Sequence, residues 1–235
     1  MKYFILLFVL LISLRSKSQV LTDMGSYRNI FQSSISYTGS FSNTTFGIAR
    51  REYFKLIHRE IIGILDVSFP VNNHFFTKHI LKKGFQVDLV QKGNFRLPFT
   101  FASASIARKN DLFKFLDFTA EFNLNPGYYH KRFYVALDLK YEMIAFRYTK
   151  YSQEYRDKVD NKAHNHCNRP SYDAFKIGFI SGINFNKWTI YIKTGYEKNP
   201  FTINNYIPGY LTFGGGYKFG QKPFKNKNTT SITKI

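Results

Sequence analysis

The stretch "PGYLTFGGGYKF", residues 208–219, alternates between two kinds of side chain. Its odd positions, such as Leu211, Phe213 and Phe219, are largely apolar, whereas its even positions are small, polar or end in a hydroxyl or amine. Because successive side chains of a β-strand point to opposite faces, the pattern predicts a strand with one apolar face. Whether that face contacts a protein core or lipid decides the class of protein, and we expect lipid.

The same alternation recurs along the chain. "DAFKIGFISGINFN" (173–186) and "WTIYIKTGYEK" (188–198) form a predicted hairpin around Asn186 and Lys187. Further alternating segments are "IFQSSISYTGSF", "TTFGIARREYF", "IIGILDVSFP", "FQVDLVQ", "FRLPFTFASASIARK", "DFTAEFNL" and "RFYVALDLKYEM". Together they predict about 10 strands, within a range of 8 to 12.

The predicted connections differ in length in a nearly regular order. Short turns fall at 92–94, 125–127 and 186–187, and longer loops fall at about 70–82, 149–171 and 197–207. Outer-membrane barrels keep short turns on the periplasmic side and longer loops outside. The sequence therefore predicts an all-β, antiparallel, up-and-down transmembrane β-barrel over residues 19–219, with both termini in the periplasm.

The ends of the chain predict export. Residues 1–18 combine Lys2, an apolar run too short to span a bilayer, and small residues before Gln19, which is typical of a signal peptide. Removing them takes three positive charges from the net +19 and leaves +16. Export argues against nucleic acid as the partner of this basic chain and favours anionic lipid headgroups or acidic glycans. Residues 220–235 are expected to form a basic, disordered periplasmic tail, with peptidoglycan or a periplasmic protein as a conceivable partner.

A soluble periplasmic carrier of an apolar ligand, similar to a lipocalin, would also show alternating strands. Two features favour lipid instead. The polar face mixes charges with small residues such as Gly178 and Gly214, which suits a narrow lumen, and 19% of the residues are aromatic, as the girdles of membrane barrels require. The single cysteine, Cys167, excludes an intrachain disulfide framework.

The charges on the polar faces are predicted to lie in the lumen. These are Asp117, Glu121, Asp138, Lys140, Glu142, Lys176, Lys193 and Lys218. A barrel of this size leaves little free space, and buried charges favour partners of opposite sign, so we expect these groups to pair and close the lumen. A narrow channel for small ions or solutes is the alternative.

The loops predicted to lie outside are basic. The cations assigned to them are Lys78, Lys82, Lys83, Arg147, Lys150, Arg156, Lys158, Lys162 and Arg169. They are interpreted as facing the phosphates of lipopolysaccharide, with a merely solvated surface as the alternative. His164, His166 and Cys167, joined by Asp160, are weak candidates for a metal site, and no cofactor is expected.

Four stretches carry a resemblance to a known group: the signal ending at Ser18-Gln19, "HREIIGILDVSFPVNNHFF" (58–76), "NPGYYHKRFYVALDLKYE" (125–142) and "YIPGYLTFGGGYKF" (206–219). The chain resembles small outer-membrane β-barrel proteins of the Bacteroidota, a largely uncharacterised group. The resemblance implies a bacterial outer-membrane location and a terminal strand, ending at Phe219, that is read by the barrel-assembly machinery. The chain departs from that pattern by continuing beyond Phe219.

Catalysis by such a barrel would need a nucleophile beside a base near a strand end. Serines occur in "FQSSISYTGSFS" and "FASASIARK", but the strand register places no histidine beside them. We therefore expect no enzymatic activity, and a structural or loop-mediated binding role.

Overall fold

The computed structural model describes residues 27–38, 41–54, 59–71, 78–109, 113–169, 173–198 and 209–220. The predicted signal peptide and all of the predicted tail except Gly220 lie outside these residues. The strands are β1 (Asn29–Thr38), β2 (Phe41–Phe54), β3 (Arg59–Pro70), β4 (Lys78–Lys92), β5 (Phe95–Lys109), β6 (Phe113–Leu124), β7 (Gly127–Tyr129), β8 (Phe133–Tyr151), β9 (His166–Asn168), β10 (Asp173–Phe185), β11 (Trp188–Lys198) and β12 (Gly209–Phe219). One short helix, α2 (Gln153–Lys158), follows β8.

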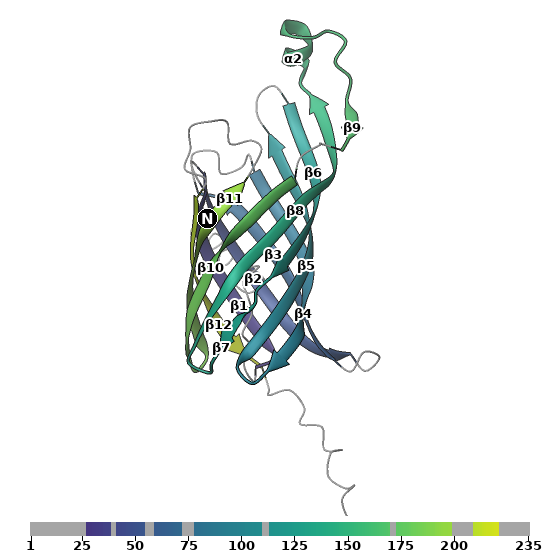
Figure 1. Ribbon diagram of the computed structural model, residues 1–235. Helices are drawn as coiled ribbons and strands as arrows, with labels where there is room; N and C mark the ends of the chain where they lie inside the picture. The colour runs from purple at the N-terminus through teal and green to yellow at the C-terminus, as the bar shows by residue number, and fades with distance from the viewer. Residues whose placement is uncertain are drawn as a thin grey trace, which may run out of the picture.

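Ten strands form a closed antiparallel barrel (Figure 1). Neighbours along the chain pair in order from β1 to β6, then through β8, β10, β11 and β12, and β12 pairs with β1 to close the wall. The short strands β7 and β9 are additions, because β7 pairs with β5 and β8, and β9 pairs with β8 alone. The predicted strand number and antiparallel barrel are confirmed.

The two ends of the barrel differ as the loop lengths predict. At one end, here called the turn end, tight turns occupy residues 93–94 and 186–187. At the other end β8 runs on for a total of 19 residues, and α2 and β9 stand above the barrel wall beside β6 and β8 (Figure 1). Residues 148–169, here called the outer extension, therefore rise from one side of the barrel.

The outer surface of the wall is rich in large apolar side chains, whereas the inside combines charged and hydroxyl-bearing side chains with two buried clusters, one of Ile30, Ala49, Ile62 and Ile64 and one of Tyr129, Tyr134, Ala136, Ile180 and Tyr191. Along β10 and β11 the outward residues Phe179, Trp188 and Ile190 are each 59–60% exposed. Inward residues such as Asp138 and Lys193 are at least 90% buried. Large exposed apolar side chains around the wall are typical of a transmembrane barrel and argue against the lipocalin-like alternative. Among the described residues, no helix is long and apolar enough to cross a bilayer.

Aromatic residues gather at the turn end of the outer surface. Phe133 begins β8, Phe185 ends β10, Trp188 begins β11 and Phe219 ends β12, and all four side chains are exposed. Aromatic rings at this depth match the interfacial girdle of membrane barrels. The girdle marks where one edge of the apolar band lies on the barrel.

Inside the barrel, tyrosine rings lie over glycines of the neighbouring strand. A Cβ atom at Gly182 would lie 2.4 Å from Cζ of Tyr134, and one at Gly214 would lie 2.1 Å from Cζ of Tyr191. Both tyrosines are almost fully buried. The glycines on the lumen face are therefore needed because the rings occupy the space of a side chain.

The lipid-facing surface can be tested by comparing two positions of one strand. Phe179→Lys, in the middle of β10, is expected to lower the free energy of unfolding by about 2 kcal/mol, because the ammonium would be placed in hydrocarbon. Phe185→Lys, at the strand end, should cost less than about 1 kcal/mol. Urea unfolding in lipid vesicles, followed by the fluorescence of the sole tryptophan, measures both. Equal costs would contradict the assignment of an apolar band.

Candidate functional site

A network of charged side chains lies along the inner wall formed by β4, β5, β6 and β8. The Glu121 carboxylate accepts hydrogen bonds from Lys82 Nζ at 2.6 Å and lies 2.8 Å from Lys140 Nζ. Lys140 also lies 3.3 Å from Glu142. Glu121 is 98% buried. Two cations therefore share one oxygen of the Glu121 carboxylate, and this arrangement links β4, β6 and β8.

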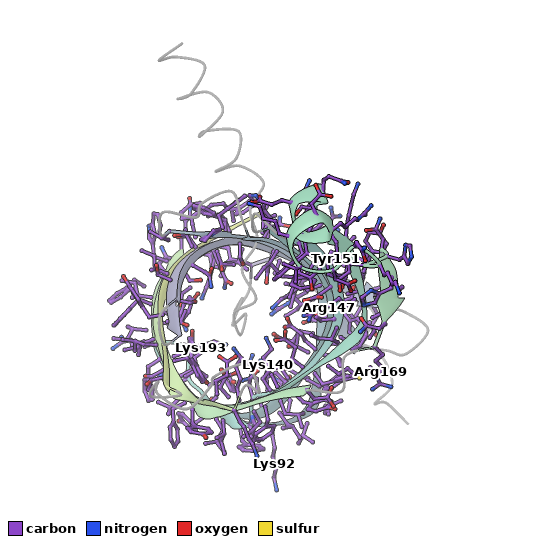
Figure 2. All side chains as sticks on the ribbon, turned by 90° about the horizontal axis from the view of Figure 1, so that it is seen from above. Lys92, Lys140, Arg147, Tyr151, Arg169 and Lys193 are labelled. Atoms are coloured by element: carbon purple, nitrogen blue, oxygen red, sulfur yellow. The ribbon has the colours of Figure 1, made fainter. Side chains whose placement is uncertain are left out.

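Asp138 is the centre of a second group on the adjoining wall. Asn125 Nδ2 and the Tyr210 hydroxyl donate to its carboxylate at 2.9 and 3.0 Å, and Lys193 Nζ lies 3.5 Å away. Lys140 and Lys193 point into the lumen from separate strands (Figure 2). The carboxylate is therefore held by strands β8, β11 and β12 and by the loop that follows β6.

Tyr210 reaches Asp138 by lying along the wall. The strand register aligns Asp138, Gly178, Gly195 and Tyr210 in one row across four strands. A Cβ atom at Gly178 would lie 2.4 Å from the Tyr210 hydroxyl, and one at Gly195 would lie 2.9 Å from its ring. Because the two glycines have no side chains, the Tyr210 ring can lie in the groove above them. The hydrogen bond to Asp138 fixes the position of the hydroxyl.

The β1–β3 side of the lumen is less filled. A cavity of about 150 Å³ is lined there by serine and threonine hydroxyls, by Asp66 and by the lysines of the networks. Its serine and threonine residues are Ser34, Ser36, Thr45, Ser68 and Thr212. Thr45 and Ser68 share a hydrogen bond of 2.8 Å, and Thr212 donates to Ser36 at 3.1 Å. This volume has room for several water molecules.

The structure places the predicted lumen charges inside the barrel, in three separate places. Glu121, Asp138, Lys140, Glu142 and Lys193 belong to the networks just described, and Lys176 pairs with Glu197 at 2.5 Å. Asp117 lies nearer the outer extension, where it pairs with Arg147. Lys218 lies nearer the turn end and donates to Asn184 at 2.8 Å.

Two cations assigned to the outer loops lie in the lumen instead. Lys82 is an inward residue of β4, which begins at Lys78, so the loop is shorter than predicted. Arg147 belongs to β8, where a bulge shifts the register between Phe146 and Ile144 and turns the following odd residues inward. Arg147 Nε and Nη2 donate to Asp117 at 2.5 and 2.8 Å, and the label in Figure 2 marks it on the inner wall.

The other predicted cations differ in their surroundings. Lys150, Lys158, Lys162 and Arg169 are exposed in the outer extension, and Arg156 donates to Tyr151 O and Asn165 Oδ1. Lys83 points outward from the wall of β4, beside Phe85. Lys78 is the first residue of β4, and its side chain lies outside the described part of the structure.

The weak metal candidates do not converge. His166 and Cys167 are successive residues of β9, so their side chains point to opposite faces. Among the described residues, no group of three or more His, Cys, Asp or Glu side chains is arranged to hold a metal ion. Cys167 is exposed and unpaired.

Sequence reasoning missed Asp66, Glu197 and Tyr210. The signal was present, since Asp66 shares the inward face of "IIGILDVSFP" with Ser68, and Glu197 shares that of "WTIYIKTGYEK" with Lys193. The alternation in 208–219 places Tyr210 on the polar face, but the hydrogen bond from its hydroxyl to Asp138 depends on Gly178 and Gly195, which lie beneath the ring.

Comparison with solved structures finds other barrels at low similarity. The translocator domain of the autotransporter NalP from Neisseria meningitidis is 13% identical, with 83% of this chain and 88% of that chain covered and a TM-score of 0.40. The KdgM porin is 8% identical over 81% and 99%, with a TM-score of 0.36. The β-domain of the Bordetella autotransporter BrkA is 9% identical over 83% and 100%, also with 0.36.

No protein-family model and no curated protein matches the chain. The assignment as a small β-barrel of the outer-membrane type rests on the chain's own strand pairing and on its apolar exterior.

Proposed function

We propose that this protein is a bacterial outer-membrane barrel that is closed to solutes and binds phosphate-bearing lipid of the outer leaflet through its outer extension. The observation that carries the proposal is a contrast between two sets of charges. Lysines at the middle of the lumen are engaged by carboxylates of the same wall, whereas several cations at the outer end have no ion-pair partner among the described residues.

Closure is supported by the position of the ion pairs. Glu121, Lys140 and Asp138 each contact groups from more than one strand at the same level of the barrel, and all three point inward. These groups narrow the lumen beside the cavity on the β1–β3 side, so a permeating ion would have to lose part of its water shell next to them, which is costly. The lumen is therefore expected to resist both ions and larger solutes.

Lipid binding is supported by the cations of the outer extension and the adjoining strand β6. Lys114 and Lys150 are directly opposite each other on β6 and β8, and both are exposed. Like charges in this arrangement repel each other unless an anion lies between them. Lys162 and Arg169 add two exposed cations nearby in the chain. Phosphates of lipopolysaccharide are the anions that this surface of an outer-membrane protein would meet.

If these lysines bind lipid phosphates, removing them should weaken lipid binding more than removing lysines elsewhere on the surface. Lys114→Ala combined with Lys150→Ala should weaken binding to lipopolysaccharide micelles by about tenfold, with the difference shrinking at high salt. The matched control is Lys131→Ala with Lys187→Ala, which removes two exposed lysines at the turn end. Fluorescence titration of the folded barrel measures both. If the control pair loses as much affinity as the test pair, the attraction is general and the proposed surface is wrong.

Closure is tested by current across planar bilayers. The folded wild-type barrel is expected to give no stepwise conductance. Regular single-channel steps from the wild type would support the second candidate, a narrow channel, which is favoured by the cavity lined by hydroxyl groups on the β1–β3 side.

A further inference from the structure

A groove crosses the outer surface of the wall over strands β2 to β5. The register aligns Arg50, Gly63, Phe85 and Phe101 in one row across these strands, and Gly63 contributes no side chain to it. The groove has a volume of about 740 Å³, within the range of pockets that hold small ligands. Its outward apolar lining consists of Ile48, Phe54, Ile61, Leu65, Phe85 and Phe101. The wall is therefore recessed here, at a place where its surface faces lipid.

Charged side chains stand where the groove approaches the turn end. Arg50 and Glu52 line the groove, and Glu52 forms ion pairs with Arg50 and, at 3.1 Å, with Arg28. Two guanidiniums around one carboxylate leave one net positive charge. The three side chains are 43–59% exposed. Because a guanidinium has five N–H donors, both arginines keep donors for a further acceptor.

The charged end of the groove lies beside the aromatic girdle. Asn29 pairs both with Arg50 and with the girdle residue Phe219, so two strand spacings, about 10 Å, separate the backbones of Arg50 and Phe219. Aromatic girdles lie at the level of the lipid headgroups. The arginines are therefore at headgroup depth, while the apolar floor around Gly63 extends into the hydrocarbon. A phospholipid has the same division between its phosphate and its acyl chains.

Lys83 lines the groove farther from the turn end. It pairs with Leu65, and it precedes Phe85 by two residues on β4, which begins at the outer end with Lys78. A lysine at such a position packs its aliphatic stem on apolar surface and extends its ammonium toward the nearer interface. The stem of Lys83 therefore suits an acyl chain, and its ammonium points away from the arginines at the other end.

We infer that this groove binds one anionic phospholipid of the periplasmic leaflet, with the phosphate on Arg28 and Arg50 and an acyl chain over Gly63. Arginine binds phosphate through two parallel hydrogen bonds, and basic surfaces at the membrane interface attract anionic headgroups. A zwitterionic headgroup would bring its own cation next to the two arginines. The inference rests on the proposed outer-membrane location, with the turn end in the periplasm, and needs neither closure of the lumen nor binding of lipopolysaccharide.

The test maps where a lipid contacts the folded wild-type barrel. Phosphatidylglycerol with a photoactivatable diazirine in one acyl chain is mixed into phosphatidylcholine vesicles that contain the barrel. After illumination, mass spectrometry of the peptides should find the label concentrated on the groove residues of β3, β4 and β5. Unlabelled phosphatidylglycerol should reduce this label, whereas the same amount of added phosphatidylcholine should not. Even labelling around the wall would mean a general lipid layer only and would overturn the inference, as would equal competition by the two lipids.

Matched variants separate the two parts of the site. Gly63→Phe fills the groove, and Arg28→Gln with Arg50→Gln removes its cations, so each should lower the groove label by about tenfold. Ser181→Phe adds the same ring to the outward face of β10, and Arg132→Gln removes an exposed cation outside the groove, so both should keep the label. Equal losses in test and control variants would contradict the site.

The mapping on the wild type does not depend on the folding of any variant. It also leaves the outer extension untouched, because Lys114 and Lys150 lie at the opposite end of the barrel. A barrel that lacks the groove label but still binds lipopolysaccharide micelles through those lysines would refute this inference alone. Failure here is therefore distinguishable from failure of the proposed function.

Discussion

Replacing Gly178 by alanine is expected to lower the free energy of unfolding by about 3 kcal/mol or more. The added Cβ would lie 2.3 Å from the carbonyl oxygen of Thr194 on β11 and 2.4 Å from the Tyr210 hydroxyl. The first contact can be relieved only by separating β10 from β11, because the colliding atom belongs to the backbone. The second displaces Tyr210 from Asp138. One methyl group therefore disturbs both the wall and the network inside it.

Gly63→Ala is the matched control. Gly63 lies on the outward face of β3, and the nearest atom to an added Cβ is the carbonyl oxygen of Arg50 at 3.8 Å. Alanine should be neutral there or stabilise slightly, since glycine in a strand loses more backbone entropy on folding. Urea titration in vesicles, with Trp188 fluorescence as the signal, compares the two variants. A Gly178→Ala barrel as stable as Gly63→Ala would mean that the two strands approach less closely than described.

The barrel was predictable because alternation and turn residues are local signals. The alternation in 208–219 predicts which residues face the lumen and which face lipid. The observed strand β12, Gly209–Phe219, agrees with this prediction, since Lys218 is buried and Phe213 is exposed. The strand number follows from repeating this reading along the chain. Which strands pair can then be predicted as well, because consecutive strands joined by short turns usually pair with each other in antiparallel fashion.

The site was less predictable because it depends on register and on small departures from alternation. A single bulged residue in β8 moves Arg147 from the outer surface into the lumen, and the sequence around Ala145 carries no mark of it. The surroundings of Asp66 follow from its alignment with Gly47 on β2 and Lys82 on β4. Such alignments are set by the closure of the whole sheet, so a reading of one strand at a time cannot supply them.

Asp138→Ala is expected to have the second large effect, a loss of about 3–5 kcal/mol in the free energy of unfolding. The carboxylate is 96% buried, accepts hydrogen bonds from Asn125 and Tyr210, and forms an ion pair with Lys193. Alanine would leave an ammonium and a hydroxyl without these acceptors inside the barrel. Asp138→Asn should cost less, because the amide oxygen can still accept from Tyr210.

The control for Asp138 is Asp157→Ala in α2, where an exposed carboxylate accepts one hydrogen bond from Gln153 at 3.0 Å. It should change the free energy of unfolding by less than about 0.5 kcal/mol.

The comparison of Asp138→Ala with Asp157→Ala also tests whether the lumen is closed. If Asp138→Ala is as stable as Asp157→Ala, water already reaches Lys193 and Tyr210 at little cost. The lumen would then be wet through its middle, and the narrow channel would replace the closed barrel as the better account. A large loss, together with single-channel steps in Asp138→Ala that the wild type lacks, would show that the same ion pair stabilises the barrel and closes it.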